Sequence, residues 1–449
     1  MAAIYKTIFT LLVFLYLFAY GIKFSSVPIS IFLSIMSVIY LYCYKLMPIF
    51  FKIWVREIVL VLTVVLYLLY VEAIHGIAFS TGNYSFYVIR ILIDGILPAY
   101  VLADIAKKAK VNFSDFVFVL VAILLIEFIF SSAMLIAPDF KSSIFAYVNE
   151  YNDQSVWMNE DLFFNRGFGI AYTYLAWFPF ALALIFLFCL FSNVIQSKIF
   201  LPLLALATII LIVVNARIGF VPLLVGILIY LSVSSAQDIK KAAGVALTIS
   251  LVLYALSFFD ASDQIEARIE FFKKWVVDEG ILSFFSQEGS GTVRDLSNFQ
   301  ILSDFSFLDF IFGRGDILIP ENGDMYTDVG YMQTLYTGGL ILSFSLYALF
   351  IFFIKRLIDV TRTLCAKGTI PQTFIYFPLV IGISFVIGHG KLRIFEINEA
   401  TRLLLLVISF FMVLSEPNYG VAKLRYLNPK KKDNLESEKQ VLLETLGRN

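Results

Sequence analysis

Long apolar runs alternate with short polar connections along the chain as far as about residue 416. Most of these runs are roughly 20 residues long, which is enough for a helix to cross a hydrocarbon core of about 30 Å. The pattern therefore predicts about twelve membrane-spanning helices. We place these spans at residues 4–24, 27–47, 53–74, 87–106, 115–137, 168–191, 198–215, 217–234, 241–258, 326–354, 370–389 and 399–416.

Two connections, residues 138–167 and 259–325, are much longer than the others. Because the rest are short, we predict one helical transmembrane domain over residues 1–416 with two extramembrane loops, followed by a charged tail over residues 417–449. The second loop mixes charged with aromatic side chains, and Ile265–Val277 has the apolar spacing of an amphipathic helix. We expect this loop to fold against the membrane face and cover a site.

Composition agrees with a membrane protein. Of the 449 residues, 60% are hydrophobic and only 15% are charged, a balance with which a soluble protein would not cover its own surface. The first apolar run has no small-residue cleavage site, so it is expected to be a span and not a removable signal peptide. The three cysteines are scattered, the two histidines lie far apart, and no glycine-rich phosphate loop is present. We expect the lipid bilayer as a partner, with no metal, cofactor or nucleic acid.

Lysine and arginine are distributed unevenly between the two sets of connections. One set, which includes the tail, carries most of the basic residues: Lys45, Lys52, Lys107, Lys108, Lys110, Lys198, Lys240, Lys241, Lys355, Arg356, Arg362, Lys367, Lys423, Arg425, Lys430, Lys431 and Lys432. The loop 259–325, on the opposite side, has five basic and thirteen acidic residues. By the positive-inside rule both termini are cytoplasmic and both long loops lie outside, with Lys23, Lys391 and Arg393 as outer exceptions.

Several ionisable side chains fall at the outer ends of the predicted spans, where charge is costly and usually has a purpose. Arg90 and Asp94 lie one helical turn apart in the fourth span. They either form a salt bridge that helps the helix to insert, or Arg90 faces a cavity that opens outwards.

Two outer arginines lie next to glycines at the membrane interface. Arg166 is in the string FNRGFG, and Arg217 is in the tight turn NARIGF. Each arginine is either an interfacial anchor or a ligand for phosphate, since a guanidinium group matches phosphate oxygens in a bidentate fork. A lipid pyrophosphate would be a suitable ligand.

The second long loop ends in FGRGD (residues 312–316), which is followed by ENGDMYTDVGYMQTLYTGG. Asp328 lies near the outer start of the tenth span. It either caps that helix, or it accepts a proton from a sugar hydroxyl as a general base. Both roles are compatible with one position.

The last outer turn, GHGKLRIFEINEATR, is also rich in ionisable side chains. His389 is a second candidate for the general base, with helix capping as the structural alternative. Arg393 and Arg402 either complete a pyrophosphate site or pair with Glu396 and Glu399, and pairing is favoured for Arg402.

Together these features resemble the oligosaccharide repeat-unit polymerases of the O-antigen and capsule type (the Wzy type), and the related O-antigen ligases. The architecture of about twelve spans with a large second outer loop is similar over most of the chain. In sequence the resemblance is confined to NARIG, FGRGD and DVGYMQTLYTGG. Ligases begin the last motif with histidine and have glycines about eleven and fourteen positions later. Here Asp328, Gly339 and Leu342 occupy these positions, which favours a polymerase.

The resemblance implies an all-α, GT-C-like, metal-independent glycosyltransferase in the bacterial inner membrane. It would polymerise undecaprenyl-pyrophosphate-linked oligosaccharide repeat units on the outer face, with a chain-length regulator protein as a possible partner. We expect Arg217 to act in catalysis, with Asp328 as the base and His389 as its competitor. We expect pyrophosphate or glycan to be bound by a set of arginines: Arg90, Arg166, Arg217, Arg268, Arg294, Arg314 and Arg393.

Two other functions fit part of this pattern. An O-antigen ligase would use the same lipid donor with a different acceptor. A lipid-linked oligosaccharide flippase belongs to a different class and also has about twelve spans, but transporters commonly have paired repeats and charges near the midplane. This chain has no convincing repeat between its halves, and its ionisable groups gather at one face.

Overall fold

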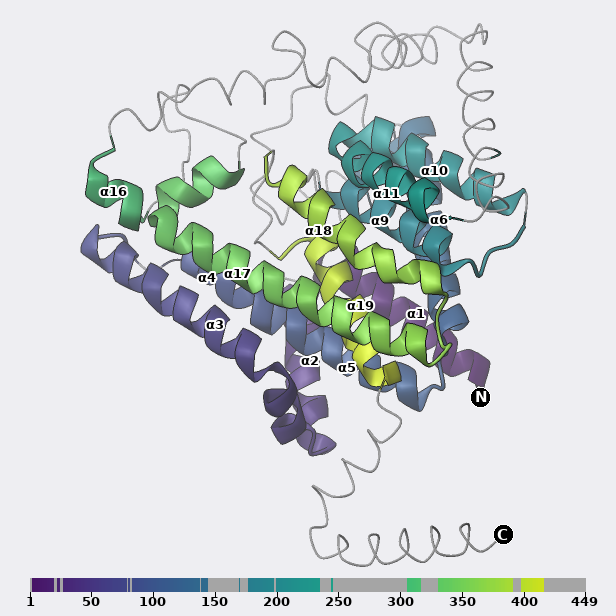
Figure 1. The fold of residues 1–449 in the computed structure, drawn as a ribbon, viewed down its shortest axis with the longest axis horizontal. Helices are drawn as coiled ribbons and strands as arrows, with labels where there is room; N and C mark the ends of the chain where they lie inside the picture. Colours follow the sequence, from purple (N-terminus) through teal and green to yellow (C-terminus); the bar gives the residue numbers. More distant parts are fainter. Residues whose placement is uncertain are drawn as a thin grey trace, which may run out of the picture.

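The computed structural model describes residues 2–19, 22–24, 27–78, 80, 83–137, 139–143, 169, 177–197, 199–234, 244, 305–315, 330–390 and 397–415. The described part is a bundle of helices with a single two-residue antiparallel β pairing (Figure 1). In chain order its elements are α1 (Ala2–Leu17), β1 (Lys23–Phe24), β2 (Val27–Pro28), α2 (Ile29–Cys43), α3 (Met47–Ile74), α4 (Tyr84–Arg90), the π-helix η1 (Ile91–Ile96), α5 (Leu97–Lys108), α6 (Phe113–Ile136), α9 (Trp177–Ser192), α10 (Phe200–Asn215), the 3-10 helix η3 (Arg217–Gly219), α11 (Phe220–Val233), α16 (Phe307–Phe312), α17 (Gly330–Ala366), the 3-10 helix η6 (Gln372–Tyr376), α18 (Phe377–Gly388) and α19 (Glu399–Ser415).

The predicted all-α membrane architecture is confirmed at this level. Eleven of the predicted spans contain a helix, and the ninth, 241–258, lies outside the described residues except for Gly244. Within the described part, four helical stretches are long and apolar enough to cross a membrane: α3, α4 to α5, α6 and α17. The other apolar helices are shorter. The count of about twelve spans and the GT-C likeness remain predictions.

The helices differ strongly in burial. All residues of α9 are buried, as are nearly all of α19, so these two helices form the centre of the bundle. In contrast, α2 and α3 expose large apolar side chains such as Phe32, Leu66 and Tyr70, which are 58–67% accessible. Apolar side chains on the outside are what a hydrocarbon environment requires, because lipid tails and not water cover them.

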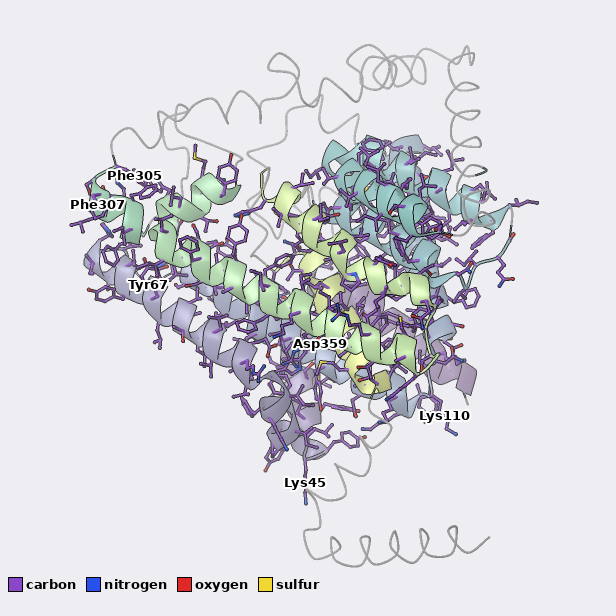
Figure 2. The ribbon with its side chains drawn as sticks, in the orientation of Figure 1. Lys45, Tyr67, Lys110, Phe305, Phe307 and Asp359 are labelled. Carbon is purple, nitrogen blue, oxygen red and sulfur yellow. The ribbon has the colours of Figure 1, made fainter. Side chains whose placement is uncertain are left out.

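With α4, η1 and α5 taken as one continuous stretch, successive long helices run in alternating directions, so that their connections gather at two ends. We call one of them the lysine end, because it carries Lys45, Lys108, Lys110 and Lys367. Contacts tie it together: Lys108 pairs with Asp104, Tyr40 donates to the same carboxylate, and Lys367 donates to the carbonyl of Ser415 at the end of α19. Lys45 and Lys110 lie on the lower side of the bundle in Figure 2, far from Phe305 and Phe307.

The opposite end is called the loop end here. It contains η3, the start of α17 and the end of α18. The described basic connections thus share one end, as the charge pattern predicts. The compartment that each end faces remains a prediction.

Aromatic rings pack densely near the lysine end. The ring centres of Phe188 in α9 and Phe374 in η6 lie 4.8 Å apart, and the ring centre of Phe113 in α6 lies 5.6 Å from that of Phe374. The Phe116 ring stacks on the Phe410 ring with 4.1 Å between their centres. Such pairs contribute about 0.5–1.5 kcal/mol beyond the burial of their area. Since lipid removes most of the hydrophobic drive between helices, this packing is a main source of cohesion in the bundle.

One boundary differs markedly from the sequence-based expectation. The tenth span was predicted to end at residue 354, with Lys355, Arg356 and Arg362 in a connection, but α17 continues to Ala366. The reason is a partner on another helix. The Arg356 side chain is only 19% exposed; its Nη2 donates to the Glu57 carboxylate of α3 at 3.0 Å, and its Nε lies 2.8 Å from the other carboxylate oxygen.

Candidate functional site

The first turn of α9 is a meeting point at the loop end. Three glycines pack closely against it: Gly219 and Gly388 come from distant parts of the chain, and Gly169 lies a short way before α9. At Gly219 an added β-carbon would lie 2.9 Å from the carbonyl oxygen of Pro179, at Gly169 it would lie 2.5 Å from the Phe178 ring, and at Gly388 it would lie 3.1–3.3 Å from the rings of Phe180 and Trp177. Glycine is therefore required at Gly219, where the overlap is with backbone, and favoured at Gly169 and Gly388, where it is with ring atoms.

Each of these glycines lies close in sequence to a residue that was predicted to belong to the site. Gly219 ends η3, whose first residue is Arg217. Gly169 follows Arg166 by three positions, and Gly388 directly precedes His389. The structure thus brings together the stretches around three of the predicted site residues, although they are far apart in sequence.

Arg217 lies in a tight turn between two antiparallel helices. α10 ends at Asn215, Ala216 is extended, and the 3-10 turn then leads into α11. This is the close backbone approach that the glycine in NARIGF predicts. The backbone of Arg217 is placed at the loop end, whereas its side chain lies outside the described atoms.

His389 caps the end of α18 and is 1% exposed. Its backbone N–H donates to the carbonyl of Phe385 at 2.9 Å. Its ring lies edge-on to Tyr347 at 5.5 Å and to Tyr331 at 6.3 Å. Both tyrosines come from α17, Tyr331 from its first turn and Tyr347 from beyond its break, so the histidine packs on this helix at the end of α18. The capping role is present, and it leaves the imidazole beside two aromatic rings of α17.

The end of the second long loop docks onto a break in α17. Gly338 and Gly339 leave the helical conformation, and Gly339 has a φ of +63° and a ψ of −162°, which only glycine adopts readily. The backbone N–H groups of Arg314 and Gly315 donate to the carbonyls of Tyr336 and Thr337, both at 2.8 Å. A β-carbon at Gly339 would overlap the backbone of Ile311. FGRGD and YTGG are therefore two halves of one structural motif.

The Arg314 side chain is held in a defined position and remains 33% exposed. It lies 3.3 Å from the Asp309 carboxylate, 4.8 Å from the centre of the Phe305 ring and 5.8 Å from that of Tyr336. The Asp309 carboxylate accepts a hydrogen bond from the backbone N–H of Ser306 in a capping box. This hydrogen bond lowers the pKa of the Asp309 carboxyl, and Arg314 lowers it further. Residues 305–315, the described part of this loop, thus dock on α17, and the packing of the loop on the membrane face stays a prediction.

Two residues of α3, Tyr67 and Glu72, also stabilise this end of the bundle, although neither was predicted to be a site residue. The Tyr67 hydroxyl lies 2.9 Å from the carbonyl oxygens of both Phe312 and Gly338, so it donates across the junction between the loop and α17. Glu72 is 2% exposed and accepts from the Ser85 hydroxyl at 2.8 Å and from the Asn83 amide at 3.1 Å. A charged residue inside a long apolar run was the available signal for Glu72. No comparable sequence signal marks Tyr67.

Arg90 pairs with Asp94 at 2.6 Å, as the structural alternative predicted, and its side chain is 26% exposed. Asp94 lies in the π-helix η1 and also accepts from the Ser34 hydroxyl at 3.0 Å. The carbonyl of Asp94 accepts from the fully buried Arg402, which donates to the carbonyl of Tyr16 as well. In the described structure Arg402 therefore binds backbone oxygens of α1 and η1. The prediction for its pairing with Glu396 involves a residue outside the described part.

The remaining predicted site residues, Arg166, Arg268, Arg294, Asp328 and Arg393, lie outside the described residues. Asp328 precedes Gly330, the first residue of α17, by two positions. Among the residues that are described, no three or more His, Cys, Asp or Glu side chains cluster as metal ligands.

The described part of the loop end can thus offer a guanidinium held among rings, a buried imidazole, and an arginine-bearing turn against α9. Each is a type of group that can bind an anionic ligand or transfer a proton. A comparison of the chain with protein-family models, curated proteins and solved structures found no match.

Proposed function

We propose that this membrane-embedded protein is a glycosyltransferase that polymerises oligosaccharide repeat units linked to undecaprenyl pyrophosphate, with its site at the loop end. The observation that carries the proposal is the convergence on the first turn of α9. Stretches that contain or adjoin Arg166, Arg217 and His389 meet there, and the start of α17, which follows Asp328, packs on His389.

The chemistry fits this set of residues. Pyrophosphate is already a good leaving group, so the protein mainly has to hold the developing negative charge and position a base. Arg217 and Arg166 bind the pyrophosphate in this proposal, with Arg90 and Arg393 in supporting roles. Arg90 is already neutralised by Asp94, which makes it the weakest member of this group.

The base in this proposal is Asp328 or His389. His389 is buried beside two tyrosine rings, and an imidazole nitrogen can act as a general base. In this proposal the sugar chain passes over residues 305–315, where Arg314 offers a cation and the Phe305 ring offers an apolar face. Arg268 and Arg294 would act with them. The loop end faces the outside in this proposal, since the lysine end satisfies the positive-inside rule.

The test is a gel of surface polysaccharide from a strain that lacks the gene, complemented with the wild type, Arg217→Ala or Lys110→Gln. We expect Arg217→Ala to abolish the ladder of chain lengths while a single-unit band survives and the protein still inserts into the membrane. Lys110→Gln removes a charge at the lysine end and should leave the ladder intact. A full ladder with Arg217→Ala would remove the proposal.

The same gel separates the alternatives. Loss of the single-unit band with polymeric lipid-linked glycan outside would point to a ligase. Accumulation of single lipid-linked units inside would point to a flippase. Asp328→Asn and His389→Gln then distinguish the two candidate bases, since the residue that acts as the base should abolish the ladder when it is changed.

A further inference from the structure

An open apolar groove with a volume of about 550 Å³ lies between α17 and α18 on the outside of the bundle. Ile354 and Ile358 form one wall, and Leu379, Ile383 and Val386 form the other. The spacing of three or four residues places each set on one face of its helix. The volume is within the range of about 300–1,000 Å³ that is typical of ligand pockets.

The floor of this groove is open at Gly382. A β-carbon at this position would meet only the Ile354 side chain, at 3.8 Å. The glycine is helical and has no positive φ, so backbone conformation does not explain it. Its lack of a side chain instead makes room in the groove.

A single charged residue, Arg362, lines the groove at the end of α17. It lies one turn before the end of this helix at Ala366, close to the level of Lys367 at the lysine end. Its side chain is exposed, and its guanidinium has no salt bridge within the described part of the chain. Arg356, on the same helix, is by contrast paired with Glu57.

We propose that this groove binds an anionic phospholipid from the leaflet at the lysine end, with its phosphate on Arg362 and an acyl chain along Gly382. The apolar walls suit a hydrocarbon chain, and a guanidinium suits a phosphate. The length also fits. The 12 residues of α18 extend over about 18 Å, and half of a hydrocarbon core measures about 15 Å. The inference does not depend on the proposed enzymatic function.

The test is native mass spectrometry of the full chain released from detergent after titration with phosphatidylglycerol or phosphatidylcholine. We expect wild type to retain phosphatidylglycerol preferentially, and Arg362→Gln to weaken its apparent affinity roughly five- to tenfold, as expected for one basic residue at the membrane surface. Arg56→Gln is the matched control, because Arg56 is exposed in the same half of the bundle but lies on α3, outside the groove.

Gly382→Phe tests the acyl-chain part of the site. The added ring fills the groove, so this variant should lose both lipids, and its elution profile in size-exclusion chromatography checks that it still folds. The Arg362→Gln and Arg56→Gln pair decides the proposal independently of this variant. Equal retention of the two lipids by wild type, or equal weakening by the two arginine variants, would overturn the proposal, since general surface charge would then explain the binding.

Discussion

The two ends of the bundle differ in how their charged side chains are paired and in how regular their helices are. Near the lysine end, buried charges are each other's partners: Glu57 pairs with Arg356, and Asp104 pairs with Lys108. At the loop end, the backbone departs from regular helix at η3 and at the break in α17. There the Arg314 side chain lies beside aromatic rings as well as Asp309, and the His389 ring is buried against two tyrosines.

The difference separates cohesion from candidate chemistry. A charge that is fully paired with a neighbour has little capacity left for a substrate, whereas an irregular backbone costs stability and persists where the surroundings hold it in place. Paired charges and stacked phenylalanines therefore identify the lysine end as the structural half. The loop end is the half in which the proposed glycosyltransferase site is to be sought.

The largest expected effect on stability is at the pair near the lysine end. Glu57→Leu leaves Arg356 buried without its partner, which should lower the free energy of unfolding by about 3–5 kcal/mol. Thermal unfolding in detergent measures the change. In the double variant Glu57→Leu/Arg356→Leu both charges are gone, and most of the loss should be recovered. If the single variant unfolds at the wild-type temperature, this pair does not hold the lysine half together.

A smaller effect, confined to the loop end, is expected for Gly339→Ala. The change imposes backbone strain of about 1–3 kcal/mol and an overlap with Ile311. The loop should undock from α17, so that the amides of Arg314 and Gly315 exchange hydrogen faster in solution.

The matched control for this variant is Gly368→Ala at the lysine end. Gly368 has a similar φ of +67°, but nothing lies within 4 Å of an added β-carbon, so only strain of about 1–2 kcal/mol applies. Exchange at Arg314 should not change in this control. Equal exchange in the two variants would mean that the break in α17 is not what docks the loop.

The smallest effect is expected for Asp309→Asn, because a partly exposed ion pair contributes less than about 1 kcal/mol. The pKa of Asp309 is lowered in the folded protein, so its contribution is present above the ordinary pKa of about 4 and is lost as the pH falls through the folded value. The gap between wild type and variant in unfolding temperature should therefore close below about pH 4. A gap that persists at lower pH would assign the effect to something other than this carboxylate.

Much of the fold followed from local sequence. A run of roughly 20 apolar residues has to satisfy its backbone hydrogen bonds within itself in lipid, so the helices are predictable one at a time. The grouping of basic connections is predictable as well, because each connection contributes its charge independently of the others. The glycine beside Arg217 likewise predicted a tight backbone approach.

Tertiary structure alone decided which groups meet. Arg356 belongs to α17 and not to a connection because Glu57, far away in sequence, lies beside it. The break at Gly338 and Gly339 exists where Ile311 and Arg314 dock, and His389 gains its enclosure from two tyrosines of another helix. Such partners depend on how helices pack against one another, and the apolar pattern of a single helix does not determine which residues of another helix lie beside it.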